Sequence, residues 1–244
     1  MDFPRQEIKS NARAAFKSQY GDCVGAFFLG SLIVGAIMSV GYVPSFVEII
    51  INSTSSYYTS EYVGFGSVIF MYVLIFLGSI ISAGISYMSY NIYNGKKAEL
   101  GDIFAGFKDG RFWHVLGGLF LMTLKITLWS LLLIIPGIIK AYEYFMVPYI
   151  LIDRPDISVK DAFKYSRYLT DGYKFNIFVL QLSFIGWDIL SCFTFGILNI
   201  LYVGPYQNIA LSGAYDFLKR IRMAGAETYI NGYDAAVEDD IFDE

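Results

Sequence analysis

Long apolar segments alternate with short basic segments along this chain of 244 residues. Six apolar segments are long enough to cross a bilayer, or nearly so, because a helix rises 1.5 Å per residue and the hydrocarbon layer is roughly 30 Å thick. They are residues 24–42, 63–90, 113–135, 137–152, 175–195 and 196–218. The pattern predicts an all-α membrane protein with six transmembrane helices.

The basic residues orient these segments. All but two of the 18 lysines and arginines lie before the first segment, between the second and third, between the fourth and fifth, or after the sixth. The loop at residues 43–62, between the first two segments, contains no lysine or arginine. Because positive loops stay on the cytoplasmic side, we expect a multi-pass protein with both termini in the cytoplasm. No cleavable signal peptide is expected, since the first 20 residues are polar and charged.

Proline residues divide the second half of the chain. Pro136 with Gly137 separates the third and fourth segments and predicts a tight outer turn that makes them a hairpin. Pro148-Tyr149 and Pro205-Tyr206 occupy corresponding places on the fourth and sixth segments. Proline removes a backbone hydrogen bond, so both are expected to kink the returning helices. We interpret these kinks mainly as a packing device.

A basic segment with helical periodicity precedes each pair of spans, at residues 5–19, 99–110 and 158–170. Apolar residues gather on one face of each segment, which predicts cytoplasmic amphipathic helices in the plane of the lipid headgroups. In the third segment that face also includes Ser166. The opposite face carries Lys160, Lys164 and Arg167, which we expect to face anionic lipid.

Related residues recur at matching places in these units. Ala-Phe-Lys or Gly-Phe-Lys occurs at residues 15–17, 106–108 and 162–164, and the returning span of each pair carries a tyrosine of the Tyr149 type. We interpret the chain as three pseudo-repeated hairpins, with units of about 5–90, 99–152 and 158–218. Together they would form a single membrane domain over residues 1–222. The acidic segment 223–244 is expected to be a mobile cytoplasmic tail.

Composition agrees with the membrane assignment and argues against an enzyme. Hydrophobic residues make up 55% of the chain and charged residues 16%, whereas soluble proteins are about a quarter charged. His114 is the only histidine, and the chain has no phosphate-binding loop, HExxH or CxxC motif. We therefore expect no catalytic residues, no metal site, no cofactor and no nucleic-acid partner.

Charged residues inside the apolar segments are the candidate functional residues. They are Lys125, Lys140, Glu143 and Asp188. A charge at membrane depth is costly unless it is paired or faces a polar cavity. Glu143 is expected to face the protein interior and to pair with Lys125 across the hairpin or with Lys140, its i,i+3 neighbour. Structural pairing and a polar cavity both remain open.

The run PGIIKAYEYFMVPYILIDRPDISVKDAFKYSRYLTDGYKF, at residues 136–175, resembles a known family, as does VGPYQNIALSGAYDFL at residues 203–218. The chain is similar to the family named domain of unknown function nine-seven-five, small polytopic membrane proteins mainly of Gram-positive bacteria. This resemblance covers most of the chain and is densest over residues 136–218. It implies a bacterial cell membrane location and about six spans. It implies no activity and supplies no catalytic residues.

Two functional hypotheses follow. The first is a non-enzymatic membrane component that interacts with lipids, anionic ones in particular, or with a protein partner or a second copy of itself. The alternative is a transporter or channel for a small solute, ion, lipid or peptide. A water-accessible cavity reached by Lys125, Glu143 and Asp188 would favour transport, whereas a dry centre packed with aromatic residues would favour the first hypothesis.

Overall fold

The computed structural model describes residues 2–54, 65–108 and 110–242, and this part of the chain is helical with no strand. The side chains of residues 38, 41–54, 65–68, 223–224, 226–228 and 230–242 are not described. The first half contains α1 (Arg5–Ser18), α2 (Tyr20–Thr54), α3 (Phe65–Tyr93), α4 (Leu100–Ile103), a 3₁₀ turn (Ala105–Phe107) and α5 (Phe112–Leu132). The second half contains α6 (Ile134–Glu143), α7 (Val147–Asp153), α8 (Val159–Thr170), α9 (Lys174–Leu182), α10 (Ile185–Phe193), a π-helix (Asn199–Val203) and α11 (Gly204–Phe242).

Five helical segments among the described residues have the length and composition of membrane spans. They are Tyr20–Ile37, Ile69–Tyr93, Phe112–Leu132, Ile134–Asp153 and Lys174–Phe193. They coincide with the first five apolar segments of the sequence, so the chain has the helices of a multi-pass membrane protein. The sixth predicted segment, residues 196–218, forms the π-helix and the first part of α11 and is not among these five.

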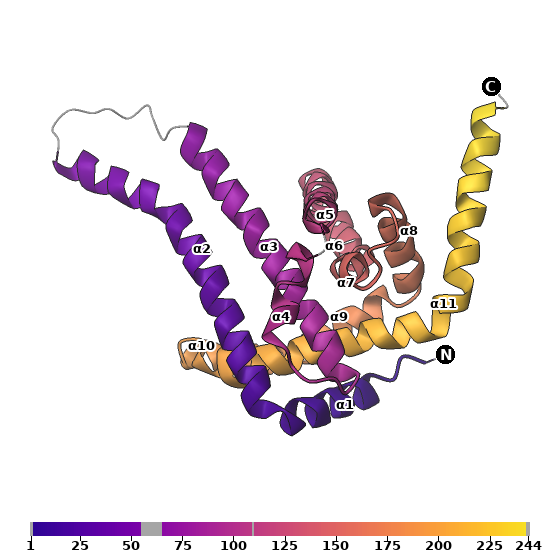
Figure 1. Cartoon of the computed structure of the whole chain (residues 1–244), viewed down its shortest axis with the longest axis horizontal. Coiled ribbons are helices and arrows are strands. Elements are labelled where there is room, and N and C mark those ends of the chain that lie inside the picture. The colour runs from indigo at the N-terminus through magenta and orange to yellow at the C-terminus, as the bar shows by residue number, and fades with distance from the viewer. Residues whose placement is uncertain (1, 55–64, 109, 243–244) are drawn as a thin grey trace.

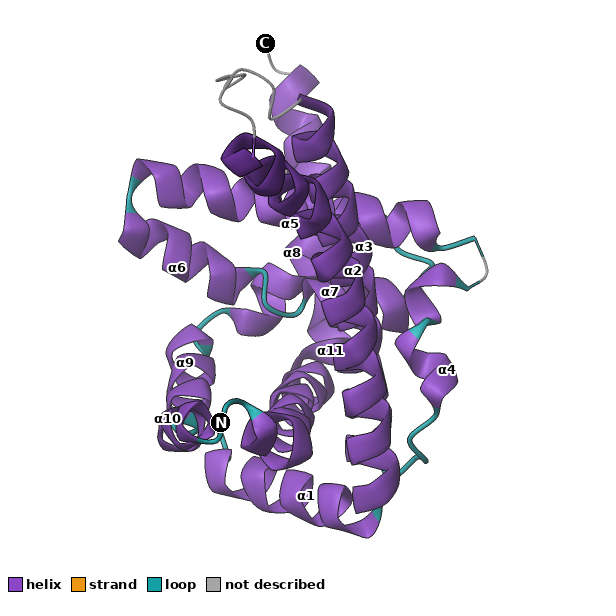
Figure 2. Cartoon of the chain, turned by 90° about the vertical axis from the view of Figure 1, so that its left-hand side faces the viewer, coloured by secondary structure: helices purple, strands orange, loops and turns teal. Residues whose placement is uncertain are grey.

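The helices are arranged as pairs that diverge from a common base (Figures 1 and 2). Figure 1 shows α2 and α3 rising together to the upper left, while α10 and the first part of α11 run across their lower parts. In Figure 2, α5 and α6 run side by side toward the left. The pair α2–α3 and the pair α5–α6 therefore point in different directions.

The core lies at the base, where α11 contacts α1, α3, α8 and α9. Its centre is Tyr215, which is fully buried. The ring of Tyr149 stacks on that of Tyr215 with 5.1 Å between centroids, and Tyr90 meets it edge-on at 5.3 Å. Stacked and edge-on pairs of this kind add to the stability that burial of the rings provides. Tyr90 and Tyr149, which the sequence placed at equivalent positions, thus meet on one ring.

The turn between α5 and α6 differs from the predicted one. Leu133, with an extended backbone, separates the two helices, and Pro136 and Gly137 lie in the first turn of α6. Proline is well tolerated there because the first N–H groups of a helix have no partner within the helix. Glycine is required for close approach, since a Cβ at Gly137 would lie 2.7 Å from Cα of Ser130.

Pro148 marks a break between two helices where the sequence predicted a kink within one. The helix α6 ends at Glu143, and α7 begins at Val147 with Pro148 in its first turn. The carbonyl of Tyr144, expected to be left free by Pro148, accepts a hydrogen bond from the N–H of Val147 at 3.0 Å. Pro205 likewise lies in the first turn of α11, directly after the π-helix.

The acidic C-terminal segment continues the last helix. The sequence predicts a mobile tail after Arg222; α11 extends through this segment to Phe242, and its mobility stays a prediction. The ring of Tyr229 stacks on that of Tyr168 with 4.9 Å between centroids. The guanidinium of Arg222 lies over the rings of Tyr168 and Tyr173. The chain therefore packs against the folded domain at least as far as Tyr229.

Candidate functional site

Glu143 is the centre of the candidate site. It is the last residue of α6 and is 4% exposed. Its Oε1 accepts hydrogen bonds from Lys140 Nζ at 2.8 Å and from Arg167 Nε at 2.9 Å. Its Oε2 accepts one from Lys174 Nζ at 2.9 Å. Cations from α6, α8 and α9 thus converge on one buried carboxylate, and the predicted pairing with Lys140 is one of three ion pairs.

The backbone of Glu143 is held as firmly as its side chain. Because α6 ends there, the carbonyl of Glu143 is available to α8. Ser166 Oγ donates a hydrogen bond to it at 2.7 Å, and Thr170 Oγ1 lies 3.3 Å away and shares its one hydrogen with the carbonyl of Ser166 at 2.9 Å. Both hydroxyl groups are buried, so these bonds replace water that the carbonyl would otherwise need. The hydroxyl groups on the face of α8 thus satisfy the carbonyl at the end of α6.

The helix α8 begins on a side-chain cap that fixes its position. Ser158 Oγ accepts a hydrogen bond from the N–H of Asp161 at 3.1 Å, in agreement with the spacing of serine and acid in the sequence. Ala162, Ser166 and Leu169 are buried on the face that meets the core. Arg167, next to that face, turns its side chain to Glu143.

Lys125 is not a partner of Glu143 in the described structure. Its ammonium lies over the ring of Phe163, 4.0 Å from the centroid, and 5.7 Å from that of Tyr144. The two rings meet edge-on with 5.0 Å between centroids. A cation over the face of a ring is attracted by its quadrupole. Lys125 was one of the two lysines that the sequence offered as partners of Glu143. In the structure it contacts the rings of Phe163 and Tyr144 in place of the carboxylate.

A polar pocket of about 390 Å³ opens beside the Glu143 cluster. It is lined by Lys140, Glu143, Arg167, Tyr168, Asp171, Lys174 and Tyr229. These residues comprise three cations and two carboxylates, which leaves one net positive charge. The side chain of Arg167 is 45% exposed and that of Lys174 is 28% exposed, so both cations reach the pocket as well as Glu143. We call this the Glu143 pocket.

Glu143 stabilises the charged form of Arg167. Burial would lower the pKa of its guanidinium, but the negative charge of Glu143 and the hydrogen bonds around it raise the pKa above its ordinary value. Arg167 thus stays charged at neutral pH, and it remains available to an anion in the pocket.

The other predicted lipid-facing lysines differ from each other. Lys160 is exposed on α8. Lys164 Nζ lies 3.3 Å from Asp161 Oδ1, and its side chain is only 10% exposed. Lys160 and Arg167 are therefore the exposed members of the predicted basic stripe, and Arg167 pairs with Glu143.

Asp188 lies apart from the cluster. It is in the first turn of α10 and forms no ion pair with any residue that the structure describes. The tyrosines of the proline motifs are buried: Tyr149 packs on Tyr215, while Tyr206 meets Phe184 edge-on and its hydroxyl donates to the carbonyl of Lys9 at 3.3 Å. Lys125 and Asp188 thus do not line the pocket beside Glu143.

A comparison with protein families shows to which family the chain belongs. The model of the family described as "Protein of unknown function (DUF975)" matches residues 1–142 and 131–222. The chain belongs to this family. No curated protein and no solved structure matches it. The resemblance seen in the sequence is thereby confirmed, and a function for this DUF975 chain has to be argued from its own residues.

Three residues of the DUF975 site were not among the predicted ones. Lys174 was assigned only to a basic loop, and Ser166 and Thr170 were given no role. Ser166 did carry a signal, since it is a hydroxyl on an otherwise apolar helix face and such a group needs a buried acceptor. Lys174 carried none, because its contact with Glu143 depends on how α9 packs beside α6.

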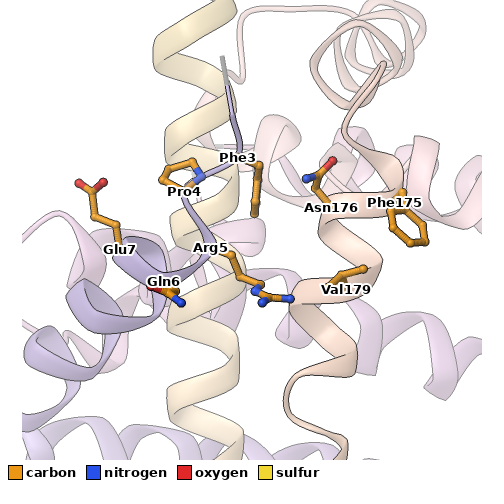
Figure 3. A pocket seen from close by; sticks show the side chains of 8 residues that line it. All are labelled: Phe3, Pro4, Arg5, Gln6, Glu7, Phe175, Asn176 and Val179. Atoms are coloured by element: carbon orange, nitrogen blue, oxygen red, sulfur yellow. The ribbon is translucent and has the colours of Figure 1, made fainter.

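A second pocket of the DUF975 chain, about 620 Å³, separates the N-terminal segment from α9 (Figure 3). Figure 3 shows the side chain of Arg5 directed toward α9 and that of Glu7 directed away from it. Phe175 and Val179 form the opposite wall. None of the predicted site residues lines this pocket.

Proposed function

We propose that this DUF975 member is a non-enzymatic membrane protein that binds the headgroup of an anionic phospholipid in the Glu143 pocket. The observation that carries the proposal is the convergence of three cations on one buried carboxylate at the wall of an open polar pocket. Glu143 sets the positions of the cations, and the N–H groups that it does not bind are available to a ligand in the pocket.

The donor count favours a phosphate ligand. A lysine ammonium carries three N–H donors and a guanidinium carries five. Lys140 and Lys174 each use one donor on Glu143, while Arg167 uses its Nε on Glu143 and has a further side-chain hydrogen bond with Tyr144. Arginine suits phosphate because its planar fork matches two phosphate oxygens. A phosphodiester carries a single negative charge, which would neutralise the net charge of the residues that line the pocket.

The proposed topology brings cations from the cytoplasmic basic connection after the fourth span to the pocket. We propose six spans, with residues 196–218 as the sixth, three repeated hairpins, and amphipathic helices on the cytoplasmic face of a bacterial cell membrane. Arg167 and Lys174 then belong to the basic connection between the fourth and fifth spans. The cytoplasmic leaflet is where anionic lipids attract basic residues. The alternative of a transport site made by Lys125, Glu143 and Asp188 has less support, since Lys125 packs on Phe163 and Asp188 is in α10.

The proposal predicts selective stabilisation by lipid. Thermal unfolding of the full chain is followed in a neutral detergent with added short-chain phosphatidylglycerol or phosphatidylcholine. Because a ligand at 100 times its dissociation constant stabilises by about 2.7 kcal/mol, phosphatidylglycerol should raise the unfolding temperature by roughly 5 °C or more. Phosphatidylcholine should have little effect.

Two substitutions locate the effect. Lys174→Gln should abolish most of the shift caused by phosphatidylglycerol, because it removes a cation from the pocket wall. Lys160→Gln removes the same charge from the exposed face of α8 and should leave the shift unchanged. Equal shifts with both lipids, or equal losses in the two variants, would contradict a site in the Glu143 pocket.

A further inference from the structure

A further polar pocket, of about 250 Å³, lies where the α2–α3 hairpin meets the π-helix. Its polar residues are Ser31, Ser82, Ser86, Asn199 and Asn208, and none of its lining residues is charged. Ser82 is 11 residues before the end of α3 at Tyr93, which corresponds to roughly 16 Å along the helix. With a hydrocarbon layer of roughly 30 Å, this places the pocket near the middle of the membrane.

The backbone at this pocket is irregular. Gly204 N–H bonds to the carbonyl of Asn199, five residues earlier, in the π-helix of Asn199–Val203. A Cβ at Gly204 would lie 2.8 Å from that carbonyl oxygen, so only glycine fits. Pro205 follows and has no N–H to donate. Turns of π-helix inside longer helices are frequent at functional sites, and irregular backbone at membrane depth is tolerated where it lines a cavity.

The polar side chains of the pocket fall into two groups. Ser82 donates to the carbonyl of Gly78 at 3.1 Å, and Ser86 donates to that of Ser82 at 3.1 Å. Asn208 Nδ2 donates to the carbonyl of Gly204 at 2.9 Å. One hydrogen of each of these donors is directed to the backbone of its own helix. The oxygens of Ser82 and Asn208 can therefore accept a hydrogen bond in the pocket, whereas the hydroxyl of Ser86 also has a side-chain hydrogen bond with Tyr149.

Ser31 and Asn199 form the second group. Neither side chain makes a hydrogen bond within the described part of the chain. A hydroxyl and an amide with no partner are costly in an apolar medium. Both can donate as well as accept. The pocket thus offers acceptors and donors together, and it offers no counter-charge for an ion.

We propose that this pocket binds a small uncharged solute that carries hydroxyl groups. Hydroxyl groups donate and accept, which matches the two groups of side chains, and an uncharged molecule avoids the cost of burying an unpaired charge. At about 30 Å³ per water molecule the volume corresponds to roughly eight waters, which leaves room for a small polyol such as glycerol. Apolar walls from Phe27 and Pro205 would contact its carbon atoms. This site is independent of the phospholipid proposed for the Glu143 pocket.

Saturation-transfer NMR on the full chain in detergent micelles tests the proposal, with glycerol as the probe and sucrose as an oversized comparison. Glycerol should receive saturation from the protein and sucrose should receive little. The double variant Ser31→Ala with Asn199→Leu should reduce the glycerol signal at least twofold. Ser39→Ala, which removes a hydroxyl elsewhere on α2 that donates to the carbonyl of Ala36, should leave it unchanged.

Three results would count against the proposed solute site. Equal glycerol signals from the native chain and the double variant would overturn the proposal, provided that circular dichroism shows both to be folded. A sucrose signal as strong as that of glycerol would overturn the size limit. A rise of the unfolding temperature in sodium chloride over choline chloride, lost in the double variant, would assign the pocket to a cation and overturn it as well.

Discussion

Replacing Glu143 with glutamine is expected to lower the unfolding temperature of the protein by about 10 °C, because removal of one partner of a buried ion pair costs about 3–5 kcal/mol. The substitution leaves Lys140, Arg167 and Lys174 facing one another without the carboxylate that joins them. The measurement is thermal unfolding of purified full chain in one detergent, followed by circular dichroism.

Two variants control this experiment. Glu99→Gln removes an exposed carboxylate that makes no side-chain cap of α4 and should change the unfolding temperature by no more than a degree or so. Adding Lys125→Met to Glu143→Leu should not rescue stability, because Lys125 packs on Phe163 and three cations still surround position 143. An unchanged unfolding temperature in Glu143→Gln would show that the cluster contributes nothing to the fold.

Replacing Gly84 with alanine is the second change with a large expected effect. A Cβ at this position of α3 would lie 1.9 Å from the carbonyl oxygen of Ile103, which belongs to the backbone of α4. A flexible side chain cannot move aside to relieve this contact, so α3 and α4 have to separate. Overpacking of this kind costs about 1–3 kcal/mol, and more where the backbone has to shift.

The readouts for Gly84→Ala are the unfolding temperature and the yield of monodisperse protein on size-exclusion chromatography, and both should fall. Gly117→Ala is the matched control, because Gly117 also lies on an apolar helix and a Cβ there meets nothing within 4 Å. If Gly84→Ala behaved like Gly117→Ala, the close contact of α3 with α4 would not exist in the folded protein.

The spans could be predicted from the sequence because their signal is local. Length and apolar composition alone identify the first five segments, and the structure has helices of spanning length there. The break at Glu143 could not be predicted, since the apolar run continues to Ile152. It depends on hydroxyl groups of Ser166 and Thr170 that arrive from a distant helix. The divergence of the hairpin pairs has no local signal either.

The partners of Glu143 could likewise be predicted from the sequence only in part. Pairing of Glu143 with Lys140 follows from helical spacing, which brings residues i and i+3 to one face. Pairing with Arg167 and Lys174 requires α8 and α9 to pack beside α6. The sequence offered Lys125 to Glu143 and Arg167 to anionic lipid. Tertiary packing instead places Lys125 on the ring of Phe163 and Arg167 on Glu143.

Native mass spectrometry of the chain extracted with its membrane lipids tests the central claim most directly. The account predicts that each chain retains an anionic phospholipid, and that the double variant Arg167→Gln with Lys174→Gln loses it while Lys160→Gln retains it. The bound lipid would be identified by its mass after release. Retention of the same lipid by the double variant, or retention of zwitterionic lipids alone by the native chain, would contradict the proposal.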